Sequence, residues 1–141
     1  MTELINFLSK HWLLSGGFGI LLLLLLINEI RQLMVVKTQL GAQETIRMIN
    51  HHNAVVIDVR EADSFRQAHI VGAINIPKEQ FFDKIVSLNK YKDKPIILAC
   101  ATGTLTPDMI IQLEKVGFEQ VYGLAGGILA WQVENLPLVK K

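Results

Sequence analysis

A single cysteine, Cys100, is the side chain of this sequence best suited to act as a nucleophile. It ends an apolar run, residues 95–100, and is followed by the uncharged residues ATGTLT and then by Pro107. This order predicts a strand, a tight loop that curls at Gly103, and a helix with Thr106 as its N-cap and Pro107 in its first turn. Successive backbone N–H groups of such a loop point inward. Together with the helix N-terminus they favour a thiolate, a persulfide or a bound oxyanion.

The loop therefore predicts a site made of one nucleophile and a surrounding backbone. Cys100 is the predicted catalytic residue, because the thiolate is the nucleophilic form of cysteine. The loop alone leaves a second interpretation open, since free cysteines often serve as small apolar residues in a core. The predicted substrate-binding residues are those whose backbone surrounds the sulfur: Ala101, Thr102, Gly103, Thr104, Leu105 and Thr106.

Short apolar runs alternate with helix-like stretches along most of the chain, which predicts an α/β domain with a mainly parallel central sheet flanked by helices. Ligands of such sheets bind beyond the carboxyl ends of the strands, and Cys100 lies at such an end. Strands are predicted at residues 54–58, 73–75, 95–100 and 120–124, and helices at residues 42–50, 61–67, 79–88, 107–116 and 128–134.

The N-terminal region carries a second, separate signal. From Trp12 to Ile27 there is no charged residue, and Lys10 and the polar residues after Ile27 can reach the two interfaces of a bilayer. A cleaved signal peptide is the alternative, but Glu3 lies in the N-terminal region and no small-x-small cleavage site follows the leucines. We therefore predict a membrane-anchor helix with its linker over residues 1–36, and a domain over residues 37–141.

Charge and composition narrow the location and the partners. The flank after the apolar run holds Arg31, Lys37 and Arg47, whereas the flank before it holds Lys10. The positive-inside rule therefore predicts a single-pass protein of the inner (cytoplasmic) membrane, with its C-terminal domain in the cytoplasm. One cysteine cannot form an internal disulfide, which agrees with that compartment. The net charge of +1 and the lack of a basic stripe predict no nucleic-acid partner.

Three blocks of the sequence, in order, resemble the rhodanese-like domain family. The first is VVIDVREADSFRQAHIVGAINIP at residues 55–77, which contains the D-V-R and G-A-x-N-I-P patterns. The second is IILACATGTLT at residues 96–106, which is similar to the family's active-site strand and loop. The third is VYGLAGGILAWQVENLPL at residues 121–138. The resemblance implies a rhodanese α/β fold and weighs against a purely structural role for Cys100.

The resemblance also implies a reaction. Cys100 would accept sulfane sulfur from a small donor such as thiosulfate or a persulfide, and would pass it to a thiophilic acceptor in two covalent steps. It implies no organic cofactor and no metal, and no particular protein partner. Asp58 and Arg60 resemble a structural ion pair of the family, and His69 a hydrogen-bonding residue of a turn, more than catalytic groups.

One departure from the family pattern bears on the donor. Many single-domain members end this loop with Arg-Ser, whereas Leu105 and Thr106 stand here. Because the loop supplies no cation, we expect weak activity with thiosulfate. The alternative function is a membrane-tethered persulfide carrier or adaptor with little thiosulfate turnover. A phosphatase on the related fold would need an arginine in the place of Thr106 and is not favoured.

Overall fold

The computed structural model describes residues 10–140. Residues 1–9, with Glu3 and the first part of the predicted anchor, and residue 141 lie outside the described residues. The chain divides into two compact units, with the boundary between Lys37 and Thr38.

The first unit consists, within the described residues, of helix α2 (Trp12–Lys37). Its segment Trp12–Ile30 is long and apolar enough to cross a membrane, and none of the apolar window is buried in the protein. Signal sequences near an N-terminus have the same length and apolar composition. The helix continues past the uncharged run because residues 28–37 include good helix formers such as Glu, Arg, Gln, Leu and Met.

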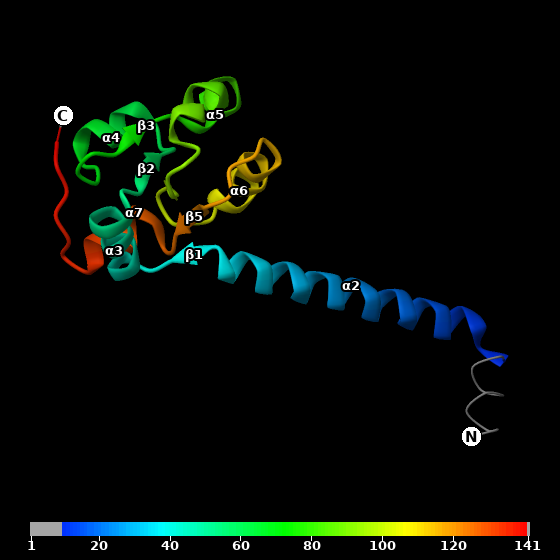
Figure 1. The fold of residues 1–141 in the computed structure, drawn as a ribbon. Helices are drawn as coiled ribbons and strands as arrows, with labels where there is room; N and C mark the ends of the chain where they lie inside the picture. The colour runs from blue at the N-terminus through cyan, green and yellow to red at the C-terminus, as the bar shows by residue number, and fades with distance from the viewer. Residues whose placement is uncertain (1–9, 141) are drawn as a thin grey trace. The chain divides into compact units, whose positions relative to one another are not determined.

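The second unit is built on a five-stranded sheet in the order β1-β5-β4-β2-β3, in which all paired strands are parallel (Figure 1). The predicted α/β fold class is thereby confirmed. Strand β1 was not expected, because two residues carry no periodicity and its place depends on pairing with a strand more than 80 residues away. The strands are β1 (Gln39–Leu40), β2 (Val55–Asp58), β3 (Ile74–Asn75), β4 (Ile96–Ala99) and β5 (Val121–Leu124).

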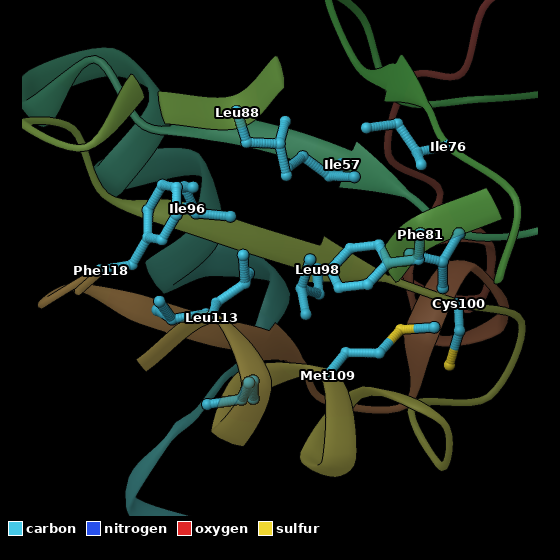
Figure 2. Close-up of a cluster of buried hydrophobic side chains, with 13 residues drawn as sticks. Ile57, Ile76, Phe81, Leu88, Ile96, Leu98, Cys100, Met109, Leu113 and Phe118 are labelled. Carbon is cyan, nitrogen blue, oxygen red and sulfur yellow. The ribbon is translucent and has the colours of Figure 1, made fainter. Parts of the chain in front are cut away.

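Helices cover both faces of the sheet. Helices α3 (Ala42–His52) and α7 (Gly127–Val133) pack on one face, in a cluster that includes Trp131. The opposite face carries α5 (Lys78–Lys84), the 3-10 helix η1 (Ile85–Tyr91) and α6 (Thr106–Lys115). Figure 2 shows the side chains of this second cluster, with Cys100 at one end beside Phe81 and Met109.

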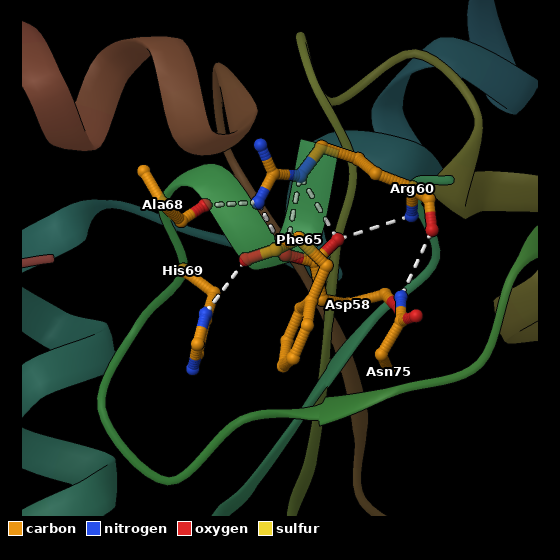
Figure 3. Close-up of polar contacts among 6 residues, drawn as sticks. All are labelled: Asp58, Arg60, Phe65, Ala68, His69 and Asn75. Carbon is orange, nitrogen blue, oxygen red and sulfur yellow. Dashed lines mark hydrogen bonds and ion pairs between the residues drawn. The ribbon is translucent and has the colours of Figure 1, made fainter. Parts of the chain in front are cut away.

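A buried ion pair holds the chain where it leaves β2 for α4 (Ala62–Gln67) and β3 (Figure 3). The Arg60 guanidinium donates to both carboxylate oxygens of Asp58, with Nη2 2.7 Å from Oδ2, and also to the Ala68 carbonyl at 2.6 Å. The Asn75 amide donates to the carbonyls of Asp58 and Arg60. The ion pair expected from the sequence is confirmed; it joins the end of β2 to the end of α4, and Asn75 of β3 binds the backbone of the same two residues.

His69 extends this brace toward the C-terminal segment. Its Nδ1 lies 2.7 Å from the Phe65 carbonyl, and its ring stacks on the Phe65 ring with 3.8 Å between centroids. Its backbone exchanges two hydrogen bonds with Val139, each 2.9 Å long. His69 is therefore held in place through both its ring and its backbone.

Candidate active site

Cys100 follows β4 directly, at the carboxyl edge of the sheet. Strand β4 lies between β2 and β5, so the cysteine stands near the centre of that edge. The strand itself is fully buried, which is why its sequence is an unbroken apolar run. Residues 101–105 then turn back, and α6 begins at Thr106. We call residues 101–106 the cysteine loop. Cys100, which precedes this loop, is 1% exposed.

Among the described residues, the sulfur of Cys100 has one backbone hydrogen-bond donor. The N–H of Gly103 donates to Sγ at 2.9 Å. Gly103 has a φ of +84°, and a Cβ there would lie 2.9 Å from the Gly126 nitrogen, so both the conformation and the space require glycine. A donor aimed at the sulfur stabilises negative charge on it, whether thiolate or persulfide.

The first turn of α7 holds the start of the cysteine loop from behind. The N–H of Ile128 donates to the Cys100 carbonyl at 2.9 Å, and the N–H of Leu129 donates to the Ala101 carbonyl at 3.1 Å. This contact is so close that a Cβ on Gly127 would lie 2.3 Å from the Cys100 carbonyl oxygen. The two carbonyls are thereby engaged by α7, which leaves the N–H side of the loop for the sulfur.

Thr106 does not cap α6, contrary to the sequence prediction. The residue in the N-cap position is Leu105, which has helical dihedral angles and makes no side-chain cap, and Thr106 is the first residue of the helix. Its hydroxyl donates instead to the Gly103 carbonyl at 3.1 Å. Thr106 is fully buried against Gly123, where a Cβ would lie 2.6 Å from Oγ1. The hydroxyl therefore fastens the cysteine loop rather than the helix start.

Gln39 of β1 reaches the same carbonyl from the edge of the sheet. Its Nε2 donates to the Gly103 oxygen at 3.4 Å. No local pattern indicates this contact, because Gln39 is 64 residues from Gly103 and lies in a strand that the sequence does not predict. Sequence reasoning also missed Ile128 and Leu129 at this site, and the neighbouring Gly126-Gly127 pair is the one sequence signal that could have indicated a close backbone approach there.

The six predicted loop residues thus divide into two groups. Gly103 and Thr106 are buried and hold the loop, whereas Ala101, Thr102, Thr104 and Leu105 are exposed. The hydroxyls of Thr102 and Thr104 lie 3.1 Å apart. Of these six residues, Gly103 is the one whose N–H donates to the Cys100 sulfur among the described hydrogen bonds.

The loop surface carries no charged side chain, and the first turn of α6 adds the exposed carboxylate of Asp108. Within residues 10–140, no three His, Cys, Asp or Glu side chains gather in an arrangement that could hold a metal ion. The site therefore contains a thiol with a backbone N–H donor, and the loop supplies no cationic side chain.

Comparison with known proteins agrees with this architecture. Residues 41–134 match the family model described as the rhodanese-like domain. The chain is 37% identical over 141 residues to the uncharacterized protein YibN of Escherichia coli K12, covering 99% of each chain. It is 29% identical to the thiosulfate sulfurtransferase GlpE of Shewanella oneidensis, over 68% of this chain and 93% of that protein.

A solved structure shows the same fold. The crystal structure of a rhodanese-related protein from Thermoplasma volcanium matches with a TM-score of 0.66 at 27% identity, over 73% of this chain and 98% of that one. The parallel sheet, the cysteine that follows its central strand and the matched residues 41–134 lead to one conclusion. The chain belongs to the rhodanese-like domain family.

Proposed function

We propose that this protein is a sulfurtransferase in which Cys100 accepts sulfane sulfur and passes it on. The observation that carries the proposal is the hydrogen bond from the Gly103 N–H to the Cys100 sulfur at 2.9 Å, at a turn where α7 engages the carbonyls of Cys100 and Ala101. That arrangement supports a negative sulfur, which both covalent states of the reaction require. The similarity to GlpE of Shewanella oneidensis, which is named a thiosulfate sulfurtransferase, supports the same chemistry.

The proposed reaction has two steps. In the first, the Cys100 thiolate attacks the outer sulfur of a donor; with thiosulfate, a new S–S bond forms as the old one breaks, and sulfite leaves with the bonding electron pair. In the second, an acceptor nucleophile attacks the outer sulfur of the Cys100 persulfide, and the thiolate is restored. The N–H of Gly103 stabilises the charge in each state. The cysteine loop and the exposed face of Thr102 and Thr104 border the entering donor.

A direct test is the intact mass of the full-length protein in detergent after incubation with thiosulfate or with a small persulfide. The expected result is a gain of one sulfur atom that a reductant removes and that Cys100→Ser abolishes. A double variant, Cys100→Ser with Ser64→Cys, places the thiol on the exposed surface of α4 as a control. If that displaced thiol gains sulfur as readily as Cys100 does, the loop adds nothing and the proposal fails.

A second candidate function, a persulfide carrier or adaptor with little thiosulfate turnover, is favoured by the uncharged loop and by the carboxylate of Asp108 near it. Thiosulfate is a dianion, and neither feature attracts one. Thiocyanate formation from thiosulfate and cyanide separates the two functions. Turnover that depends on Cys100 supports the enzyme, whereas a trapped persulfide with negligible turnover supports the carrier.

We also propose that α2 anchors the protein in the inner (cytoplasmic) membrane, with residues 37–141 in the cytoplasm. The apolar segment Trp12–Ile30 and the excess of Lys and Arg after it support this arrangement. Fusions of green fluorescent protein and of alkaline phosphatase after Lys141 test it. Fluorescence without phosphatase activity is expected, and the reverse pattern would place the domain on the other side.

A further inference from the structure

Gln39 lies outside the cysteine loop, and its side chain donates a hydrogen bond to the backbone of the loop. We propose that Gln39 is a positioning residue for Cys100: it holds Gly103 in the conformation in which the Gly103 N–H faces the sulfur. The inference rests on the proposed role of Cys100 as the sulfur acceptor. It assigns a function in the site to the edge strand β1, at the opposite end of the sequence from the loop's other supports.

Gly103 depends on such support because it has no side chain of its own to fix it. Its φ of +84° belongs to a region that glycine enters and leaves freely, so its N–H can turn away from the sulfur at little cost. The Gly103 carbonyl accepts from the Thr106 hydroxyl at 3.1 Å and from Gln39 Nε2 at 3.4 Å. Two donors on this carbonyl restrict rotation about the residue, and the N–H of the same residue stays on Sγ.

The sheet brings Gln39 and Thr106 to this carbonyl together. Strand β1 pairs with β5 so that Gln39 lies opposite Gly123. Gly123 is also the residue against which Thr106 packs, with room for no side chain between them. The backbone on either side of Gln39 is fixed, because Gly123 donates to the Thr38 carbonyl at 2.8 Å and Ala125 donates to the Leu40 carbonyl at 2.9 Å. The amide of Gln39 is therefore presented from a rigid strand.

The pattern of exposure agrees with a role at the loop. Gln39 is half-buried, although β1 is an edge strand of the sheet, where long polar side chains are free to extend into solvent. A second glutamine, Gln43 of α3, makes a bond of the same length, from Nε2 to the Glu134 carboxylate at 3.4 Å, but it is exposed and its described hydrogen bond lies outside the loop. The chain thus contains a matched control for the proposal.

The test compares Gln39→Met with Gln43→Met in the full-length protein in detergent. Methionine keeps the length of the side chain and removes the donor, so the packing of β1 is retained. The measurement is the rate of Cys100 alkylation by iodoacetamide at neutral pH, divided by the plateau rate at alkaline pH. This ratio reports the stabilisation of the thiolate and cancels a change in access to the sulfur. We expect Gln39→Met to lower the ratio about threefold, as for one weak hydrogen bond lost, and Gln43→Met to leave it unchanged.

Two results would overturn the proposal: an unchanged ratio in Gln39→Met, or an equal fall in both variants. Gln39→Glu is the second variant; it keeps the side chain polar but replaces the donor with acceptors, and its ratio is expected to fall at least as far. Thermal unfolding of each variant identifies a general loss of structure, which would also lower the control. Sulfur loading of the unchanged protein, measured by mass on the same preparations, reports separately on the proposed function.

Discussion

The carboxyl ends of two neighbouring strands, β2 and β4, are held in place by different kinds of contact. After β2, charged side chains brace the chain: the Arg60 guanidinium donates to the Asp58 carboxylate and to the Ala68 carbonyl at the end of α4. After β4, the cysteine loop is held by uncharged groups: the amides of Ile128 and Leu129, the side chains of Thr106 and Gln39, and glycines with no space for a Cβ. The first region is braced by charge, and the second by neutral hydrogen bonds and close packing of the backbone.

The two regions differ because only the second lies beside Cys100, the proposed nucleophile. A cationic or anionic brace beside Cys100 would add its own field to the sulfur, whereas amide dipoles support a negative sulfur and glycines let the backbone approach it closely. The proposed nucleophile lies at the β4 end and not at the β2 end, where a largely buried ion pair is tolerated because both Asp58 oxygens accept and Arg60 Nε and Nη2 both donate. The comparison predicts that substitutions in the two regions separate stability from sulfur acceptance.

The largest effect is expected for Gly127→Ala. Its Cβ would lie 2.3 Å from the Cys100 carbonyl oxygen and 2.6 Å from the Ala101 carbonyl, so the backbone itself must move. We expect a loss of more than about 3 kcal/mol in the free energy of unfolding, together with loss of sulfur uptake. Urea unfolding of the full chain measures the first and intact mass the second.

Gly72→Ala is the matched control for that change. Gly72 also has a positive φ, +76°, but nothing lies within 4 Å of a Cβ there. The expected loss is about 1 kcal/mol, from the backbone conformation alone. Equal losses in the two variants would mean that the contact between α7 and the loop is not what holds the site.

The next largest effect is expected for Asp58→Asn. The change leaves the part-buried Arg60 guanidinium without its carboxylate, and we expect a loss of about 3 kcal/mol in stability. Sulfur uptake by the folded fraction should persist, because no atom of this pair touches the cysteine loop. Asp63→Asn, which breaks an exposed ion pair with Arg66, should leave unfolding unchanged. Loss of sulfur uptake in folded Asp58→Asn would contradict the separation of the two regions.

A smaller effect is expected for Thr106→Val, which keeps the shape of the buried side chain and removes its hydroxyl. The Gly103 carbonyl then retains only Gln39 as a donor, and stability should fall by about 1 kcal/mol. Thr106→Ser keeps the donor and should retain the alkylation ratio of Cys100 that Thr106→Val lowers. If valine and serine behave alike, the methyl group matters and the hydroxyl does not.

The smallest effect on folding is expected for Leu105→Arg, because Leu105 is 43% exposed. The added cation beside the loop should raise the rate of persulfide formation from thiosulfate about threefold. Ile111→Arg, at a similarly exposed site further along α6, adds the same charge away from the loop and should leave the rate unchanged. An equal gain in both variants would mean that net charge, and not the loop, controls the donor.

Sequence reasoning succeeded where local patterns suffice. Strands β2, β4 and β5 lie in short, mostly apolar runs, and the positions of Cys100 and Gly103 follow from the order of strand, loop and helix. The predicted N-cap role of Thr106 was wrong, because N-cap preference reflects only the neighbouring residues. In the fold, the Thr106 hydroxyl donates to the Gly103 carbonyl instead.

What the sequence could not supply were contacts between distant segments. The bond from Gln39 to the loop spans 64 residues, and the approach of α7 to Cys100 depends on the sheet order. Gly127 illustrates the limit: only the fold shows which backbone atoms occupy the space of its missing side chain.

Because Cys100 is the only thiol in this sequence, a persulfide formed there has no second cysteine of the same chain with which to close a disulfide. Under the proposed function, sulfur would therefore leave only to another molecule. The flow of sulfur through a population of these proteins would rise in proportion to their number, and the intact mass of each chain would distinguish loaded from empty sites.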